Sequence, residues 1–366
     1  MNSILSSAQI GLMMLMLNHI KISYIKVRLS GLFCYYINMN ALSNYIKEQS
    51  HADLIIDAYG DVLYHTNLHK YLKENNLTIK DIISDIYIDP HHLNFYNQET
   101  IPHKEPVRFG NKDLEVNGHV QSHFDGPISI ANDMLNKGFN MVSLANNHTL
   151  DAGYDKLKEA YDFWQDKDVI VDGLRYQEDE YYPIYTYNGI RVAFFSWTDK
   201  LNTKYNEPSC PYFRNDFVFG RAKNEINKIR DEVDLIIVSM HWGTEYSFDV
   251  DERQKEISKF LSELGVDIII GHHSHCIQPI KMIGKTLCIY SLGNFIAYQE
   301  KSDERTQVGM HVQISYNKIK GINYKYDLNY ILKSDSKFKV IPFSKLNNDI
   351  LPGYKGKEIY YMNKIK

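Results

Sequence analysis

Short apolar runs alternate along this chain with segments of helical periodicity, and most of the runs end in a polar cluster. The runs predict strands at residues 54–58, 141–144, 191–196, 235–239, 268–270 and 287–290. Apolar residues at three- and four-residue spacing predict helices at 129–137, 154–165, 221–233 and 251–264. Residues 307–341 alternate as further strands. This order predicts a layered α/β fold whose strands are buried on both faces.

The polar clusters that follow these strands carry the residue types that chemistry requires. They are Gly60-Asp61, the segment from Asn146 and Asn147 through His148 to Asp151, the segment from His241 to Glu245, and Gly271-His272-His273-Ser274-His275. A further acid, Glu99, follows a less regular stretch. Ligands of open α/β sheets bind at the carboxyl ends of the strands. We therefore expect these clusters to converge in one crevice.

The residue types in these clusters favour a metal site. Imidazole and carboxylate ligands without cysteine suit Zn, Mn, Fe or Ni, and such mixed sites suit a two-metal hydrolase. Three imidazoles within four residues at His272, His273 and His275 favour a metal role, because crowded neutral imidazoles gain little from packing.

Several members of the set have simpler interpretations when each is taken alone. His241 could be a structural histidine, and Asp61 could belong to the turn that ends a strand. Asn146 and Asn147 could tolerate left-handed turn geometry, and Asp151 could be a helix N-cap.

Composition excludes several classes of function. The chain has 41 basic and 45 acidic residues, a net charge of −4, and no long basic run, so we expect no nucleic-acid partner. The four cysteines are widely spaced and form neither a disulfide framework nor a zinc ribbon. A P-loop fails because Pro279 occupies the position of its first glycine, and neither a G-x-S-x-G elbow nor a G-x-G-x-x-G fingerprint is present.

Residues 1–50 have three open interpretations. The run at 4–17 is apolar or small and uncharged, which suggests a weak membrane element, although it is short for a span. Basic residues follow this run rather than precede it, so a signal peptide is not supported and a cytoplasmic location stays open. Alternatively, Met39 is the true start of the protein.

Six blocks in order resemble those of the capsule synthesis protein CapA (poly-γ-glutamate synthesis) family, within the calcineurin-like metallophosphoesterase superfamily. They are Gly60-Asp61, Asn97-Gln98-Glu99-Thr100, residues 145–153, residues 241–245, residues 271–275 with Gln278-Pro279, and residues 290–295. The resemblance implies a four-layer α/β/β/α sandwich of the metallo-dependent phosphatase type at residues 51–345, followed by a C-terminal tail at 346–366.

The resemblance also implies a role for each matching residue. The expected metal ligands are Asp61, Glu99, Asn147, His241, His273 and His275, with His272 as an equally close neighbour of the last pair. Two divalent cations would then activate a water, with His148 as the acid and Asn147 and Asp151 beside it. The expected pocket residues are His65, Asn146, Glu245 and Asn294, although a plain Gly-Asn turn would also explain Asn294.

Two positions depart from the superfamily pattern. The first block usually reads Asp-x-His, but Leu63 stands two residues after Asp61, with His65 the nearest imidazole. Glu99 replaces the metal-bridging Asp. The implied function is a two-metal hydrolase acting on a phosphoester or related bond in a small molecule or polymer. The alternative is a non-catalytic metal-binding scaffold in a membrane-associated, cell-envelope complex for capsule synthesis.

Overall fold

The computed structural model describes residues 24–29, 32–37, 52–104, 114–116, 119–121, 125–151, 153–175, 184–202, 215–299, 303–334 and 337–366. The apolar run at 4–17, Met39 and Cys210 lie outside these residues. Within the described part of the chain, no helix is long and apolar enough to cross a membrane.

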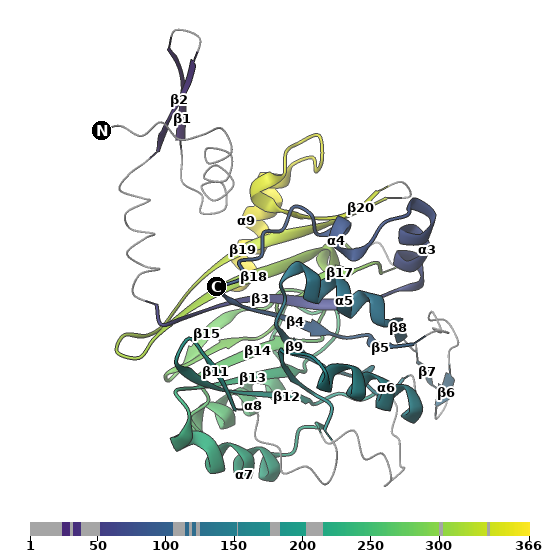
Figure 1. The fold of residues 1–366 in the computed structure, drawn as a ribbon, viewed down its shortest axis with the longest axis vertical. Coiled ribbons are helices and arrows are strands. Elements are labelled where there is room, and N and C mark those ends of the chain that lie inside the picture. Colours follow the sequence, from purple (N-terminus) through teal and green to yellow (C-terminus); the bar gives the residue numbers. More distant parts are fainter. Residues whose placement is uncertain are drawn as a thin grey trace.

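Two mixed sheets form the centre of the molecule (Figure 1). The order of the first sheet is β10 (Ile170–Asp172), β9 (Met141–Ser143), β4 (Leu93–Gln98), β3 (Leu54–Leu63), β18 (Val308–Asn317), β19 (Gly321–Ser334) and β20 (Lys337–Pro342), with β17 (Asn294–Ala297) also paired to β3. The order of the second is β11 (Ile184–Tyr187), β12 (Ile190–Thr198), β13 (Leu235–His241), β14 (Ile268–His272), β16 (Thr286–Ile289) and β15 (Ile280–Ile283).

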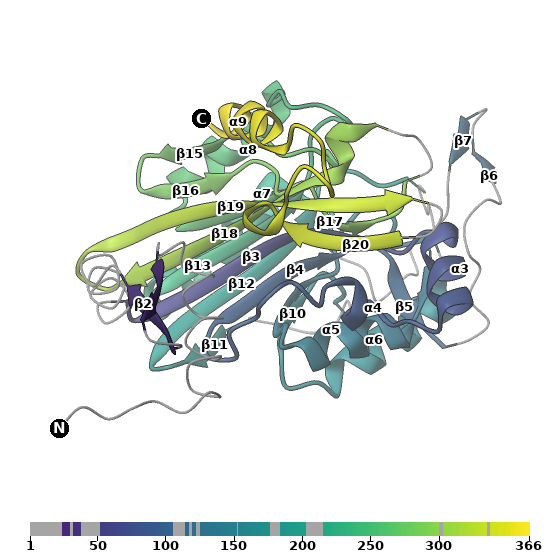
Figure 2. The same ribbon diagram turned by 90° about the horizontal axis from the view of Figure 1, so that it is seen from above.

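Helices cover the outer face of each sheet. The first sheet packs against α3 (Thr66–Asn75), α4 (Ile79–Ile82), α5 (Ile128–Lys137) and α6 (Tyr154–Gln165). The second packs against α7 (Phe219–Ile229) and α8 (Glu252–Glu263), and Figure 2 shows strands of both sheets running in similar directions. One apolar core lies between the sheets and one lies under each helical layer. The four-layer α/β/β/α sandwich is therefore confirmed.

Shorter elements complete the described chain. They are β1 (Tyr24–Leu29) with β2 (Leu32–Ile37), β5 (Ile101–His103) with β8 (Asp125–Pro127), β6 (Leu114–Val116) with β7 (His119–Gln121), three 3₁₀ turns (Arg230–Glu232, Glu304–Gln307 and Phe343–Lys345) and α9 (Tyr354–Ile365). Residues 346–366, expected only as a tail, include α9, which packs on the inter-sheet core through Tyr361 and Ile365.

The strand at 54–58 was expected to end before Asp61, and that boundary is wrong. β3 continues to Leu63, because β17 pairs with it in parallel from Asp61 onward. The register of β3 against β4 shifts between Ala58 and Asp61, an irregularity that redirects the side chains beyond it. Asp61 is therefore held inside a paired strand rather than in a free turn.

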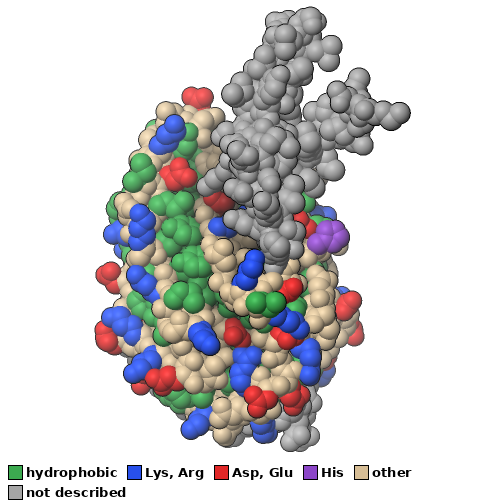
Figure 3. Space-filling model, turned by 90° about the vertical axis from the view of Figure 1, so that its left-hand side faces the viewer, with side chains coloured by type: hydrophobic (Ala, Val, Ile, Leu, Met, Phe, Trp, Pro, Cys, Tyr) green, Lys and Arg blue, Asp and Glu red, His purple; other side chains and the backbone are tan. Residues whose placement is uncertain are grey.

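Positively and negatively charged side chains are mixed on the face of the molecule that Figure 3 shows. Figure 3 views the molecule from the side where the β18–β19 turn lies in Figure 1. Basic and acidic groups are interspersed there, and a stripe of hydrophobic side chains runs between them. This face therefore carries no field of a single sign.

Candidate metal centre

The expected site residues lie where the parallel strands of both sheets end. β3, β4 and β9 are parallel in the first sheet, and β12, β13 and β14 are parallel in the second. Asp61 lies in β3, and Glu99 and Asn147 follow β4 and β9, whereas His241 ends β13, and His273 and His275 follow β14. Both sheets therefore contribute to one centre, as expected for ligands at carboxyl ends.

Asp61, Glu99 and His275 form the first group of possible ligands. All three are buried, and one ligand atom from each lies within 4.8 Å of the others. Asp61 Oδ1 accepts a hydrogen bond from Asn97 Nδ2 at 2.8 Å, and Oδ2 accepts one from the His273 backbone N–H at 3.3 Å. Burial raises the pKa of Asp61, but contacts with His272, His275 and Asn97 lower it overall. The carboxylate is held in place and ionised.

Glu99, His241 and His273 form the second group, within the same 4.8 Å limit. His241 Nε2 lies 2.8 Å from Asn147 Oδ1 and 3.1 Å from His273 Nδ1. Burial and neighbouring imidazoles lower the pKa of His241 well below its usual value, and they lower that of His273 to about 3. Both imidazoles are therefore neutral, the form that binds metal.

Glu99 belongs to both groups and has the most unusual environment in the site. Its side chain is fully buried, yet neither carboxylate oxygen has a hydrogen-bond partner among the described residues. Oε1 lies 3.8 Å from His241 Nε2 and 3.9 Å from His275 Nε2. Two ligands of one ion lie at most about 4.4 Å apart, so these contacts fit shared coordination.

Burial, followed by the charges of Asp61, Glu245 and Asp151, raises the pKa of Glu99 well above its usual value. A buried, unpaired carboxylate among neutral imidazoles is unfavourable unless a cation joins it. The residues present therefore fit bound divalent metal.

His148 and Asp151 form a pair beside the ligands. His148 Nδ1 lies 2.6 Å from Asp151 Oδ2, and Nε2 lies 3.9 Å from Glu99 Oε1. The N-cap of α6 is Gly153, so the N-cap interpretation of Asp151 is wrong. Asn146 shapes the turn itself, because its Oδ1 accepts from the His148 N–H at 2.9 Å and its Nδ2 donates to Gln98 O at 3.0 Å.

The other expected residues take different positions around the centre. His272 is buried and stacks on Phe95, with Nδ1 3.4 Å from Asp61 Oδ1, and it belongs to neither ligand group. Asn294 Oδ1 accepts from His275 Nδ1 at 3.0 Å. His65 Nδ1 accepts from the Tyr298 N–H at 3.2 Å, outside both groups. Glu245 is exposed.

Backbone strain is concentrated in the histidine loop after β14. His273 has φ 89° and His275 has φ 55°, values that non-glycine residues rarely adopt. Such strain persists only where the surrounding structure enforces it, and it is typical of functional sites. The loop therefore presents these two imidazoles at a conformational cost.

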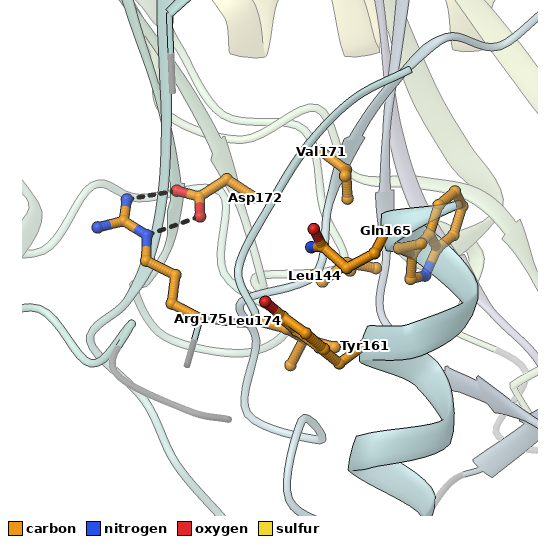
Figure 4. Close-up of a pocket in the computed structure, with 8 residues that line it drawn as sticks. Leu144, Tyr161, Gln165, Val171, Asp172, Leu174 and Arg175 are labelled. Atoms are coloured by element: carbon orange, nitrogen blue, oxygen red, sulfur yellow. Dashed lines mark hydrogen bonds and ion pairs between the residues drawn. The ribbon is translucent and has the colours of Figure 1, made fainter. Parts of the chain in front are cut away.

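A shallow pocket lies outside the ligand groups, between α6 and the ends of β9 and β10. Figure 4 shows Tyr161 and Gln165 on the helix and Asp172 facing Arg175. The Arg175 guanidinium donates to both oxygens of Asp172, at 2.8 and 2.7 Å, and it also pairs with Glu225. Its charge is therefore already compensated.

Sequence reasoning missed two contacts that hold candidate ligands in place. Asn97 donates to Asp61, and Asn202 pairs with the side chain of Asn147 at 3.1 Å. Asn97 lies in the same motif block as Glu99, but the motif indicated no role for it. No sequence pattern indicated a functional role for Asn202, because a lone asparagine after a strand is typical of any turn.

The candidate ligands lie within the part of the chain that matches a known protein family. Residues 55–299 match the model of the family described as bacterial capsule synthesis protein PGA_cap. The chain is 25% identical over 264 residues to the PGA biosynthesis protein CapA of Bacillus subtilis (strain 168), covering 68% of this chain and 65% of that one. It is also 25% identical over 253 residues to the capsule biosynthesis protein CapA of Bacillus anthracis, covering 67% and 56%.

Two solved structures show a weaker likeness. One is the sulfate thiohydrolase SoxB of Thermus thermophilus in complex with glycerol, at TM-score 0.44 and 12% identity, covering 85% of this chain and 61% of that one. The other is 5'-nucleotidase from Candida albicans SC5314, at TM-score 0.41 and 12% identity, covering 75% and 52%.

Proposed function

This chain belongs to the bacterial capsule synthesis protein PGA_cap family, and from that premise we propose a metal-dependent hydrolase of capsule or poly-γ-glutamate biosynthesis. Its substrate is a phosphoester or a related bond in a small molecule or polymer. The chain spans 65% and 56% of the lengths of the two curated relatives, so the function of those whole proteins reaches this chain only as part of the proposal.

One observation carries the proposal: Glu99 is fully buried, belongs to both groups of ligand-type atoms, and has no hydrogen-bond partner for either oxygen among the described residues. Asp61, Glu99 and His275 would hold one divalent cation, and Glu99, Asn147, His241 and His273 would hold another. When bound, such cations activate a water and neutralise charge that develops in hydrolysis.

The chain's own residues supply the remaining chemistry. Asp151 accepts from His148 Nδ1, which directs Nε2 toward the ligand groups, where it can give a proton to the leaving group. Asn294 orients His275 in the same way through Nδ1. These contacts preorganise the site before substrate arrives.

A second candidate, a non-catalytic metal-binding scaffold in a capsule-synthesis complex, is favoured by the first ligand group. That group contains one imidazole, His275, and the superfamily's other histidine position is occupied by buried Leu63. A weakly held first metal would leave a binding site without hydrolysis.

The test measures divalent-metal stoichiometry and hydrolysis of generic phosphomonoesters, phosphodiesters and γ-glutamyl peptides on one preparation of the full chain. We expect about two metals per chain and hydrolysis of one of these bonds. His275→Ala should lose metal, whereas His148→Ala should keep metal and lose rate. His91→Ala, at an exposed position away from the site, is the matched control.

Each alternative result has a defined meaning. Metal binding without cleavage of any ester or γ-glutamyl peptide supports the scaffold instead. A stoichiometry near zero contradicts both the hydrolase and the ligand assignments.

A further inference from the structure

The second ligand group is built across the two sheets of the sandwich. Asn147 lies in the turn after β9 of the first sheet, whereas His241 ends β13 of the second. Their ligand-type atoms, Asn147 Oδ1 and His241 Nε2, lie 2.8 Å apart. Coordination at this group therefore depends on how accurately one sheet is held against the other.

A four-residue segment after β12, from Asp199 to Asn202, contacts both ligands through its backbone. The Asp199 N–H donates to His241 O at 2.9 Å, and the Asn202 N–H donates to Asn147 O at 3.1 Å. The segment is itself anchored, because the guanidinium of Arg253 in α8 donates to both oxygens of Asp199. It is a short strap between the two sheets at the metal centre.

The side chain of Asn202 adds a contact that backbone atoms cannot supply. Its Oδ1 accepts a hydrogen bond from Asn147 Nδ2 at 3.1 Å. A carboxamide has one oxygen and one NH₂ group on opposite sides. Engaging the NH₂ group of Asn147 therefore turns its oxygen toward His241.

Asn202 also approaches His148, but that contact is not a competing hydrogen bond. Asn202 Nδ2 lies 3.4 Å from His148 Nδ1, and the same Nδ1 lies 2.6 Å from Asp151 Oδ2. A ring nitrogen that donates its proton to a carboxylate has no lone pair to accept a second one. The partner of the Asn202 side chain is therefore Asn147.

We infer that Asn202 is a positioning residue that fixes the amide of Asn147 with its oxygen toward the metal, and thereby sets metal affinity at the second ligand group. The inference rests on the proposed function, because it requires that Glu99, Asn147, His241 and His273 hold a cation. Partners that orient metal ligands contribute about 10–100-fold to affinity or activity.

The test is calorimetric titration of the full chain with Mn²⁺ after removal of metal with EDTA. Asn202→Ala removes the acceptor, so we expect one binding step to weaken by about 10–100-fold while the other stays within about threefold. Asn202→Asp keeps an oxygen opposite Asn147 Nδ2 and should bind within about threefold of the wild type. Asn224→Ala, at an exposed position of α7, is the matched control.

A second measurement separates positioning from a loss of structure. The visible absorption of Co²⁺ bound to the same variants reports coordination geometry, and it should change in Asn202→Ala but not in Asn202→Asp. Thermal unfolding in EDTA should remain cooperative for both variants, with Asn202→Ala lower only by the loss of one hydrogen bond. If Asn202→Ala is too unstable to titrate, Asn202→Asp is compared with Asn202→Ser. Mn²⁺ affinity should then weaken in Asn202→Ser, whose shorter side chain does not reach Asn147, and not in Asn202→Asp.

The outcomes distinguish this inference from the proposed function. Equal Mn²⁺ affinity in wild type and Asn202→Ala overturns the role of Asn202 and leaves the metal centre standing. An equal loss of affinity in Asn202→Ala and Asn202→Asp also overturns it, because the acceptor oxygen would then not matter. No Mn²⁺ binding by the wild type overturns the metal centre itself.

Discussion

His148 donates from Nδ1 to Oδ2 of Asp151 over 2.6 Å, and this contact decides which ring nitrogen faces the candidate metal ligands. With Nδ1 engaged, Nε2 is directed toward Glu99, whose Oε1 lies 3.9 Å away. A carboxylate that fixes the tautomer of a histidine is a recurrent device in acid–base catalysis. The pair therefore belongs to the proton-transfer part of the proposed site, beside the metal ligands.

Replacing Asp151 with Asn should slow hydrolysis without weakening metal binding. The amide no longer fixes His148 as the Nδ1–H donor, so kcat should fall by about 10²–10⁴-fold, the range of general acid catalysis. Mn²⁺ affinity should stay within about threefold, because Asp151 is in neither ligand group. Steady-state kinetics and calorimetry check both values, with Asp155→Asn on the exposed start of α6 as control. An unchanged kcat in Asp151→Asn would contradict the role of His148 as the general acid.

Replacing Glu99 with Gln should have opposite effects with and without metal. In EDTA, at a pH above the raised pKa of Glu99, the variant should unfold at a higher temperature, because a buried carboxylate with no hydrogen-bond partner among the described residues is replaced by a neutral amide. With Mn²⁺ at 100 times its Kd, the wild type gains about 2.7 kcal/mol and the variant should gain much less. Thermal unfolding under both conditions tests this, with exposed Glu252→Gln as control. Equal Mn²⁺ stabilisation of both chains contradicts the shared-ligand role.

His272 and His273 can be separated by replacing each with Phe. His272→Phe keeps the stack on Phe95 and removes two buried ring nitrogens, of which Nδ1 lies 3.4 Å from Asp61 Oδ1. We expect retention of both metals, because His272 is in neither ligand group, and a small loss of stability from the lost contact with Asp61. His273→Phe should lose the second metal, because His273 belongs to that ligand group. Measuring the metal content of both variants tests this prediction. Loss of metal in His272→Phe would show that His272 is a ligand.

Local patterns in the sequence predicted a layered α/β fold and the polar clusters at strand ends, whereas the four-layer order was expected only from the family resemblance. Apolar runs mark strands buried on both faces, as in β13 and β14. β4 was not predicted, because Asn94, Asn97 and Gln98 make it polar although the whole strand is buried. Amide groups of this strand donate to distant partners, such as Asn94 Nδ2 to Gly138 O at 3.0 Å and Asn97 Nδ2 to Asp61 Oδ1 at 2.8 Å, which a local pattern does not show.

The candidate site, like the fold, could be predicted from the sequence only where it depends on local patterns. Residue types at strand ends indicated candidate ligands, but which of them lie together in one centre depends on the packing of distant segments. Asn202 and Asn147 are 55 residues apart, and only the packing of one sheet on the other brings them together. The role of Asn202 was therefore inaccessible to motif or periodicity.

Gly60 should tolerate no side chain. A Cβ at this position would lie 1.8 Å from the backbone oxygen of Gly293, which accepts the Asp61 N–H at 3.0 Å. Gly60→Ala should therefore displace Asp61, lower the free energy of unfolding by about 1–3 kcal/mol or more, and weaken Mn²⁺ binding. Gly220→Ala in α7, with open space around its Cβ, should be neutral or slightly stabilising. Chemical denaturation and calorimetry test both variants. Unchanged stability and Mn²⁺ affinity in Gly60→Ala would contradict the close approach of Gly60 to the Gly293 oxygen.

Asp57 on β3 makes the fold sensitive to acid through contacts away from the metal centre. Its Oδ1 accepts from His311 Nε2 at 2.7 Å and Gln313 Nε2 at 3.0 Å, and its Oδ2 accepts from His92 Nδ1 at 2.6 Å. Burial raises the pKa of Asp57, but the hydrogen bonds from His311 and His92 lower it overall. Its folded pKa is thus below the unfolded value of about 3.9. This stabilisation is present above about pH 4 and is lost as the pH falls further.

His311→Ala should weaken this pH dependence and the fold together. The variant loses one donor to Asp57 and the stack of His311 on Tyr59, so the free energy of unfolding at neutral pH should fall by about 1–3 kcal/mol. The pKa of Asp57 should rise toward its unfolded value, so the acid-unfolding midpoint should move to higher pH. Urea unfolding from pH 3 to 8 measures both, with exposed His91→Ala as control. An acid midpoint equal to that of the wild type would show that Asp57 does not depend on His311.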